Sequence, residues 1–256
     1  MRNSNYLVKE INDLKRPREI DYAIKIQNSN SKIIFEYNSD LTFNAASLIK
    51  IVIVDYLLNN KINKSSFFNK VLPITSQDIV GGAGVLRGLS IDKLKVRDLI
   101  YLMLSISDNT ATNVLLKQLQ LQNLSEWSKN KFKNIRIERF MMNNSVENNI
   151  INLKEFMNVW TEILNSNDEL GSIVRDALSH SLTRSKLPAL ISKSGFIGEI
   201  YTKTGELTHE EHDVSRFEYD DEFIDCAVLT HFNYESQRID CIRFIQEIGL
   251  IISEIF

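Results

Sequence analysis

Proline and glycine are scarce in this chain, with three prolines and nine glycines among 256 residues. These two residue types mark turns, flexible linkers and low-complexity segments. No stretch of the sequence is rich in them, and no internal repeat is visible. The length suffices for a substantial hydrophobic core. We therefore expect one large domain, or two interleaved lobes, without a linker between them.

A strong net charge is also missing, which excludes some classes of partner. The chain carries 30 Lys and Arg against 33 Asp and Glu, a net charge of −3. It has no basic stripe with interleaved aromatic residues, so we expect no nucleic-acid partner. His, Cys and acidic residues do not cluster at metal-ligand spacing. The sequence therefore predicts no metal and no other cofactor.

Long apolar runs and cysteines are few. No segment approaches the roughly 18 apolar residues of a membrane span, and the first twenty residues have no apolar core of signal-peptide length. We therefore expect a soluble, cytoplasmic protein. The two cysteines are Cys226, in a strand-like run, and Cys241, in a helix-like run. Two buried free thiols are the default expectation, while a disulfide between them stays open.

Hydrophobic periodicity predicts strands at both ends of the chain and helices between them. Alternating residues predict a hairpin and a later meander, over 21–27, 32–38, 198–205, 213–221 and 222–232. Helical spacing predicts helices over 5–16, 47–59, 96–106, 111–119, 152–165, 172–180 and 238–256.

The economical architecture for this pattern is an α+β fold. An antiparallel five-stranded sheet built from both chain ends, residues 1–46 and 191–256, would carry flanking helices. Residues 47–190 would form an inserted all-helical lobe, and the two parts would make one integrated unit. A cleft is expected where the lobes meet, because small-molecule sites tend to form at such junctions.

A serine and a lysine stand three residues apart at the start of the apolar run FNAASLIKIVIV (43–54). On a helix this spacing puts Ser47 and Lys50 on one face. The simpler interpretation is a capping serine followed by a solvated lysine. The alternative is a nucleophilic hydroxyl beside the amine that activates it. This segment alone favours the simpler interpretation.

Two further motifs change that balance. Ser107-Asp108-Asn109 falls at a break between two predicted helices, and Lys203-Thr204-Gly205 ends a predicted strand. Each has a structural interpretation, as a helix cap or as a strand end with a turn. S-x-x-K occurs about once by chance in a chain of this length, but each tripeptide has a chance of only roughly a few per cent. All three in this order come to well below about one per cent, so we treat them as one constellation.

The order S-x-x-K, S-D-N, K-T-G resembles that of class A β-lactamases and penicillin-binding proteins. The stretches GGAGVLRGLS and VRDLIYLMLSISDNTATNVLL are similar to the family's approach to its second motif. LTRSKLPALI, YTKTGEL and HDVSRF are similar to the region of the third. The similarity covers most of residues 20–250. It implies a β-lactamase-like fold and a serine hydrolase or acyl-transferase.

The resemblance assigns the proton chemistry to four residues. Ser47 would be the nucleophile, and Lys50 would take its proton if burial and a second cation lower the pKa of that amine. Lys203 would be the second cation. Ser107 would relay a proton to the leaving group.

It assigns substrate binding to the remaining motif positions. Asn109 would hold Lys50 and a substrate amide, and Thr204 with Lys203 would bind a substrate carboxylate. The backbone N–H groups of Ser47 and Glu206 would form an oxyanion hole. Gly205 would let a substrate backbone lie close along the strand.

One element of the family pattern is displaced. Class A β-lactamases carry a loop glutamate, in an E-x-x-L-N pattern, that activates water for deacylation. Glu147 is the only acid in the middle of residues 138–156, but four positions on is Ile151, and Asn152 comes one place late. Glu147 stays a candidate deacylation base; the alternative is a solvated acid near the N-terminus of the following helix. The stretch is more similar to class A-related hydrolases that lack this glutamate.

Two polar positions after the third motif have competing interpretations. His212-Asp213 could be a proton-transfer pair, but a structural turn is favoured because the serine already has its lysine. Arg216 could bind a substrate carboxylate, but a surface arginine is favoured.

The sequence therefore predicts a serine hydrolase or acyl-transferase that forms an acyl-enzyme on Ser47. Its substrate would be an amide or ester, such as a β-lactam, a peptide or a small ester, and β-lactam turnover would be weak. The alternatives are a true class A β-lactamase, and a sensor or scaffold that is acylated by a β-lactam or peptide without turnover. The oligomeric state stays open.

Overall fold

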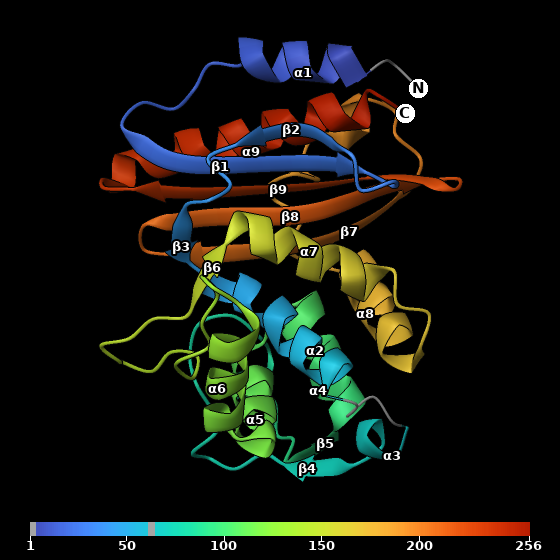
Figure 1. Ribbon diagram of the computed structural model, residues 1–256. Helices are drawn as coiled ribbons and strands as arrows, with labels where there is room; N and C mark the ends of the chain where they lie inside the picture. Colours follow the sequence, from blue (N-terminus) through green and yellow to red (C-terminus); the bar gives the residue numbers. More distant parts are fainter. Residues whose placement is uncertain (1–3, 61–64) are drawn as a thin grey trace.

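The computed structural model describes residues 4–60 and 65–256, and its largest element is a five-stranded sheet in the order β2-β1-β9-β8-β7 (Figure 1). The strands are β1 (Ile20–Asn28), β2 (Ile33–Tyr37), β7 (Glu199–Leu207), β8 (Glu210–Tyr219) and β9 (Glu222–Phe232). All neighbours are antiparallel, and β1 pairs with β9 from Ile20 opposite Phe232 to Asn28 opposite Ile224. This pairing joins the N-terminal hairpin to the C-terminal meander, so the predicted sheet built from both chain ends is confirmed.

Two helices from opposite ends of the chain cover one face of the sheet (Figure 1). They are α1 (Ser4–Asp13) and α9 (Arg238–Ser253). Leu7 and Ile248 on these helices share one hydrophobic cluster with Ile24 of β1. Cys226 on β9 and Cys241 on α9 are both buried and free, so the default expectation for the cysteines is confirmed.

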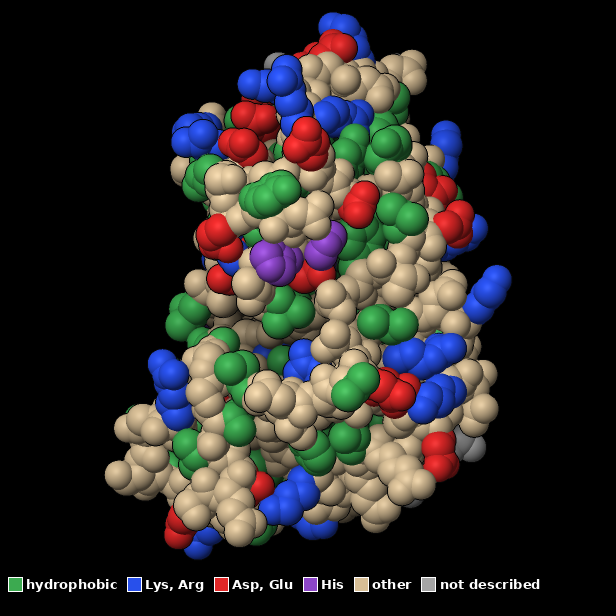
Figure 2. Space-filling model, turned by 90° about the vertical axis from the view of Figure 1, so that its left-hand side faces the viewer, with side chains coloured by type: hydrophobic (Ala, Val, Ile, Leu, Met, Phe, Trp, Pro, Cys, Tyr) green, Lys and Arg blue, Asp and Glu red, His purple; other side chains and the backbone are tan. Residues whose placement is uncertain are grey.

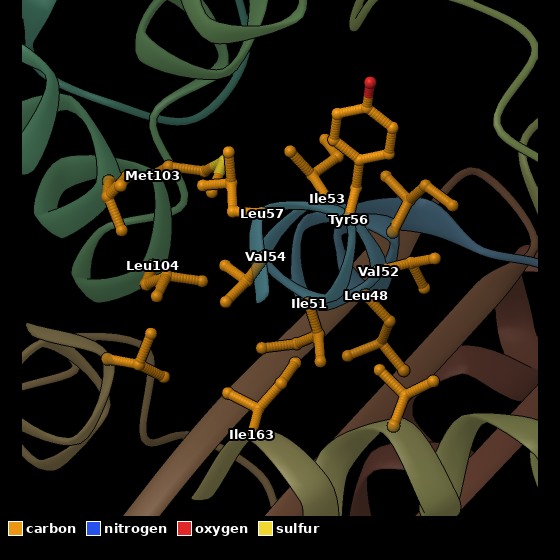
Figure 3. Close-up of a cluster of buried hydrophobic side chains, with 14 of the residues drawn as sticks. Leu48, Ile51, Val52, Ile53, Val54, Tyr56, Leu57, Met103, Leu104 and Ile163 are labelled. Atoms are coloured by element: carbon orange, nitrogen blue, oxygen red, sulfur yellow. The ribbon is translucent and has the colours of Figure 1, made fainter. Parts of the chain in front are cut away.

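The other face of the sheet packs on the helical region that contains α2, the helix directly after Ser47. The helices concerned are α2 (Ile49–Asn59), α4 (Val96–Ser105) and α7 (Leu153–Leu164). α2 is apolar around most of its circumference, as expected for a helix that is buried on all sides. Figure 3 shows its side chains packed among Met103, Leu104 and Ile163. Sheet residues such as Ala23 and Val214 belong to the same cluster. A lysine on α2 is therefore held in a largely dry interior.

Helices dominate the inserted region, but two short β ribbons interrupt it. The other α-helices are α3 (Ser65–Phe68), α5 (Asn109–Leu119), α6 (Leu121–Lys131) and α8 (Glu169–Ser179). The ribbons pair β3 (Thr42–Asn44) with β6 (Ile150–Asn152), and β4 (Val71–Pro73) with β5 (Lys93–Lys95). The expected all-helical lobe thus needs a small correction, because three-residue strands are too short for alternation to reveal. The β3–β6 ribbon ties the chain before Ser47 to the end of loop 139–149.

The expectation that Arg216 lies at the surface is wrong. This side chain is 3% exposed and contacts Asp225 on the neighbouring strand, with Nε 2.8 Å from Oδ1 and Nη2 3.0 Å from Oδ2. Trp160 on α7 donates a further hydrogen bond to Oδ1 of that carboxylate, at 3.0 Å. A buried ion pair is tolerated when both groups find partners. Arg216 therefore links the sheet to α7 and is not free to bind a substrate.

No helix within the described residues is long and apolar enough to cross a membrane. The expected localisation was based on the first twenty residues, of which residues 1–3 lie outside the described part of the chain.

Candidate active site

Ser47 lies in a single 3₁₀ turn, Ala46–Leu48, that leads directly into α2. The preceding residue, Ala46, has a φ of 47°, in the left-handed region that residues with a Cβ rarely adopt. Ser107 has a φ of 58° and is the second such residue of this site. Strained backbone persists only where the surrounding structure enforces it, and it is often found at functional sites. The two serines of the motifs thus both lie next to or at strained positions.

Lys50 is at the centre of the motif residues. Its Nζ lies 3.0 Å from Ser47 Oγ, 2.9 Å from Ser107 Oγ and 2.9 Å from Asn109 Oδ1. The lysine has no exposed surface. Burial lowers the pKa of Lys50 well below its usual value, the positive charge of Lys203 lowers it further, and Asp108 opposes the shift. The predicted contact between Ser47 and Lys50 is present, and the amine is biased toward its neutral form.

Lys203 approaches the same group from the sheet. It lies on β7, has no exposed surface, and its Nζ is 3.1 Å from Ser107 Oγ. Burial lowers the pKa of Lys203 to about 7; the charge of Lys186 adds to this shift, and Asp213 opposes it. The expected convergence of the three motifs on one point is therefore present in the structure.

Asp108 does more than the helix cap that its sequence position suggests. Its Oδ1 accepts from Ala111 N at 2.9 Å and caps α5, as expected. Its Oδ2 accepts from Val85 N at 2.7 Å and from Leu86 N at 2.9 Å. A Cβ on Gly84 would lie 2.3 Å from this carboxylate, so the loop fits only with glycine there. The buried Asp108 thus fixes loop 81–86 beside the serines.

A cavity of about 880 Å³ opens in front of these residues. Five residues of the predicted site line it, namely Ser47, Ser107, Asn109, Thr204 and Glu206. The side chains of the two lysines stand behind them, buried. The space-filling view of this side of the molecule shows the surface hollowed across its middle, with basic side chains visible in the hollow (Figure 2).

Loop 139–149 forms one wall of this cavity, and the residues that line it were not predicted from the sequence. The lining residues from this loop are Arg139, Met141, Met142, Asn143, Asn144 and Asn149. Asn113 holds the loop at one point, donating to Met141 O and accepting from Met141 N at 3.1 and 2.8 Å. Asn149 holds its ends together, accepting from Arg139 N and donating to Arg139 O. Asn113 comes from α5, 28 residues before Met141, so this part of the wall could not be derived from local pattern.

Glu147 is not brought to the serine. It is exposed, and it is absent from the described residues that line the cavity. Asn152 is also committed elsewhere: its Oδ1 caps α7 by accepting from Glu155 N, and its Nδ2 donates to the carbonyls of Asp40 and Leu41. The side chains that the loop presents to the cavity are therefore two methionines, amides and an arginine.

A side chain on Gly205 would face the turn that carries Ser47. A Cβ at this position would lie 3.2 Å from Ala46 Cβ and 3.2 Å from Leu48 Cγ. Glycine therefore lets β7 lie directly against the turn that carries Ser47. Because Gly205 has no side chain, β7, which carries Lys203, can lie close to Ser47.

His212 and Asp213 lie within strand β8 and not in a turn, which corrects that expectation. His212 Nε2 donates to Asn44 O at 2.8 Å, because a carbonyl can only accept, and burial lowers the pKa of the ring to about 4. Asp213 accepts from Leu187 N at 2.9 Å and from Thr202 Oγ1 at 3.0 Å, and burial raises its pKa to about 7. Both side chains are fully buried and hold neighbouring segments in place.

No group of His, Cys, Asp and Glu in residues 4–60 and 65–256 is arranged to hold a metal ion.

The fold and the cluster around Ser47 define a serine hydrolase of the β-lactamase-like class, and solved structures share this architecture. A β-lactamase from Sphaerobacter thermophilus is 20% identical with a TM-score of 0.80, over 99% of each chain. PBP-A is 18% identical with a TM-score of 0.78, over 98% of this chain and 95% of that one. A β-lactamase from Francisella tularensis is 21% identical with a TM-score of 0.77, over 96% of this chain and 97% of that one. At these identities the structures share the fold.

The family follows from the sequence as a whole. Residues 6–256 match the model of the β-lactamase enzyme family. The chain therefore belongs to that family. A comparison with curated protein sequences finds no match.

Proposed function

We propose that the protein cleaves an amide or ester by forming an acyl-enzyme on Ser47, and that it releases a β-lactam-derived acyl group slowly. The observation that carries this proposal is the 3.0 Å contact between Ser47 Oγ and the wholly buried amine of Lys50. A hydroxyl is a weak nucleophile until a neighbouring base takes its proton. Desolvation and the positive charge of Lys203 lower the pKa of Lys50, which favours the neutral form that this task requires.

In the acylation step, Lys50 and Ser107 move the protons. Ser47 Oγ attacks the carbonyl carbon while neutral Lys50 takes the hydroxyl proton. The N–H groups of Ser47 and Glu206 stabilise the negative oxygen of the tetrahedral intermediate. As the carbon–nitrogen or carbon–oxygen bond breaks, the leaving group receives a proton from Ser107, which regains one from Lys50 across 2.9 Å.

Substrate recognition is assigned to the sheet side of the cavity. Thr204 lines the cavity and Lys203 lies directly behind it, 3.1 Å from Ser107 Oγ. A carboxylate on the substrate would be attracted by protonated Lys203 and accept from the threonine hydroxyl. Asn109 keeps one amide N–H on Gly81 O at 3.1 Å and has a second for a substrate carbonyl.

Slow release follows from the cavity wall that loop 139–149 forms. Hydrolysis of the ester needs a water beside its carbonyl and a base to take the proton. Glu147 is exposed and outside the described lining of the cavity, while Met141 and Met142 belong to it. This wall is the observation that favours an acyl-retaining sensor as the second candidate function. PBP-A, of which a single-substitution variant is known as an acyl-enzyme complex with penicillin G, has the same fold.

The test is intact-protein mass spectrometry after mixing with penicillin G and, separately, with p-nitrophenyl acetate. We expect a covalent adduct on the wild type and none on Ser47→Ala, with the exposed Ser185→Ala as the matched control. A lasting penicillin adduct without product favours the sensor, and a slowly decaying one favours the weak hydrolase. Equal labelling of wild type and Ser47→Ala, or no adduct with either probe, would refute the proposal.

A further inference from the structure

Lys186 is a third buried lysine near the site, and neither the acylation step nor substrate binding described above uses it. It lies between α8 and the final strands and is 2% exposed. Its Nζ donates to Gly205 O at 2.9 Å and to His212 O at 3.1 Å. Glu211 supplies the countercharge, with Oε2 2.5 Å from the same nitrogen. The ammonium is thus aimed at the backbone of the third motif.

The contacts of Lys186 with the carbonyls of Gly205 and His212 show in which direction the backbone groups of β7 point. Gly205 and His212 are directly opposite each other in the β7–β8 ladder. A single ammonium that contacts both carbonyl oxygens requires both to point into the space between the strands. In an antiparallel pair the direction of these groups alternates from residue to residue. The N–H of the next residue, Glu206, therefore points away from β8, and β7 is an edge strand.

The same peptide unit connects the lysine to the cavity. The carbonyl of Gly205 and the N–H of Glu206 belong to one planar peptide, in which they point in opposite directions. Lys186 binds the carbonyl end, and Glu206 lines the cavity together with Ser47 at the other end. A charge-assisted hydrogen bond to a carbonyl is roughly twice as strong as a neutral one. It also polarises the peptide, so that the N–H becomes a better donor.

We infer that Lys186 is a positioning residue that orients and polarises the Gly205–Glu206 peptide, so that the Glu206 N–H stabilises the negative oxygen formed during acylation. This inference rests on the proposed acyl-enzyme on Ser47. It assigns the lysine a role beyond the ion pair with Glu211, which by itself would only stabilise the end of the sheet.

The experiment compares acyl-enzymes by difference infrared spectroscopy, using penicillin G with a ¹³C-labelled β-lactam carbonyl. The ester carbonyl band reports the strength of the hydrogen bonds that this oxygen accepts. Lys186→Met should move the band to higher wavenumber and slow acylation by about tenfold to a hundredfold, less than the loss of a whole oxyanion donor. Lys186→Arg keeps a buried cationic donor, so its carbonyl band and its acylation rate should be close to those of the wild type.

Two controls separate this role from a structural one. Lys25→Met removes a different buried, ion-paired lysine, on β1, that is 4% exposed and 3.5 Å from Glu36, and should leave the carbonyl band unchanged. The double variant Lys186→Met/Glu211→Gln removes the charge without leaving a carboxylate that has lost its lysine, and should show the same band shift as Lys186→Met. If the single variant fails to fold, the double variant and Lys186→Arg carry the comparison.

The outcomes are distinguishable. An unchanged band and wild-type acylation in the folded Lys186 variants overturn the inference while the acyl-enzyme stands. A shift of equal size in Lys25→Met would mean a general loosening of the sheet and would also overturn it. Absence of any adduct on the wild type refutes the proposed function itself, and this inference with it.

Discussion

Lys50 and Lys203 share one hydroxyl: Ser107 Oγ lies 2.9 Å from the first Nζ and 3.1 Å from the second. Two ammonium groups this close in a buried site are unfavourable, because burial and like charge both disfavour the protonated forms. Both lysines are fully buried, and the pKa of each is lowered, to about 7 for Lys203 and well below the usual value for Lys50. Burial is the main cause for both amines; the charge of Lys203 adds to the shift of Lys50, and the charge of Lys186 adds to the shift of Lys203.

The first prediction concerns Lys50. Lys50→Met should slow acylation by penicillin G by at least about a hundredfold, the lower range for the loss of a general base. The measurement is the rate of adduct formation by rapid-quench mass spectrometry. Lys117→Met, on an exposed side chain paired with Asp78, is the matched control and should label like the wild type. A Lys50 variant that labels within a few-fold of wild type would assign the base to another group.

The second prediction is a pH dependence of binding. The pKa of Lys203 is about 7, so the side chain is protonated below that pH and loses its charge above it. The apparent affinity for a substrate with a carboxylate should therefore fall as pH rises through about 7. The ratio of acylation rate to half-saturating concentration should be measured from pH 5.5 to 9 for penicillin G and for its methyl ester. The methyl ester should not show this decline. An identical decline for the ester would show that the pH dependence does not arise from the substrate carboxylate.

The third prediction concerns release of the acyl group. Because Glu147 is exposed and outside the described cavity lining, Glu147→Gln should leave the decay of the penicillin adduct unchanged within about twofold. Loss of a positioned general base would instead cost about 10²- to 10⁴-fold. Stopped-flow acylation followed by mass spectrometry of the adduct gives both rates. Release at hundreds per second that collapses in the variant would make the protein an ordinary class A β-lactamase.

The fourth prediction concerns packing at the nucleophile. Gly205→Ala places a methyl group 3.2 Å from Ala46 Cβ and Leu48 Cγ, so β7 or the turn carrying Ser47 must shift. Overpacking of this kind typically costs about 1 to 3 kcal/mol of stability. A displacement of this turn should also slow acylation by about tenfold or more. Gly88→Ala, where a Cβ meets nothing within 4 Å, is the control for both urea unfolding and acylation. Unaltered acylation in Gly205→Ala would show that the methyl group can be accommodated without displacing Ser47.

Local physics made much of this protein readable from its sequence. Alternation and helical periodicity depend only on neighbouring residues, so the five strands and the main helices were predicted close to their observed bounds. The i, i+3 spacing of Ser47 and Lys50 required only that the segment be helical, and it begins as a 3₁₀ turn that leads into α2. The motif order then predicted which distant segments would meet.

Burial and partner choice were decided by tertiary structure, because they depend on segments far apart in the chain. Arg216 can be buried because it donates to the carboxylate of Asp225 on the neighbouring strand. Trp160 on α7 donates a further hydrogen bond to that carboxylate. Glu147 is exposed because asparagines at 113 and 149 hold its loop in a conformation that presents methionines to the cavity.

Lys186 illustrates the same limit most clearly. In the sequence it is one lysine in a polar stretch, with no local pattern that distinguishes it from a solvated side chain. Its position against Gly205 O follows from the packing of the segment after α8 on two strands that the chain forms later. The sequence determined the residues that can react, and the packing of distant segments determined their charge states and the direction of the backbone groups around them, because desolvation and hydrogen-bond partners exist only once the chain has folded.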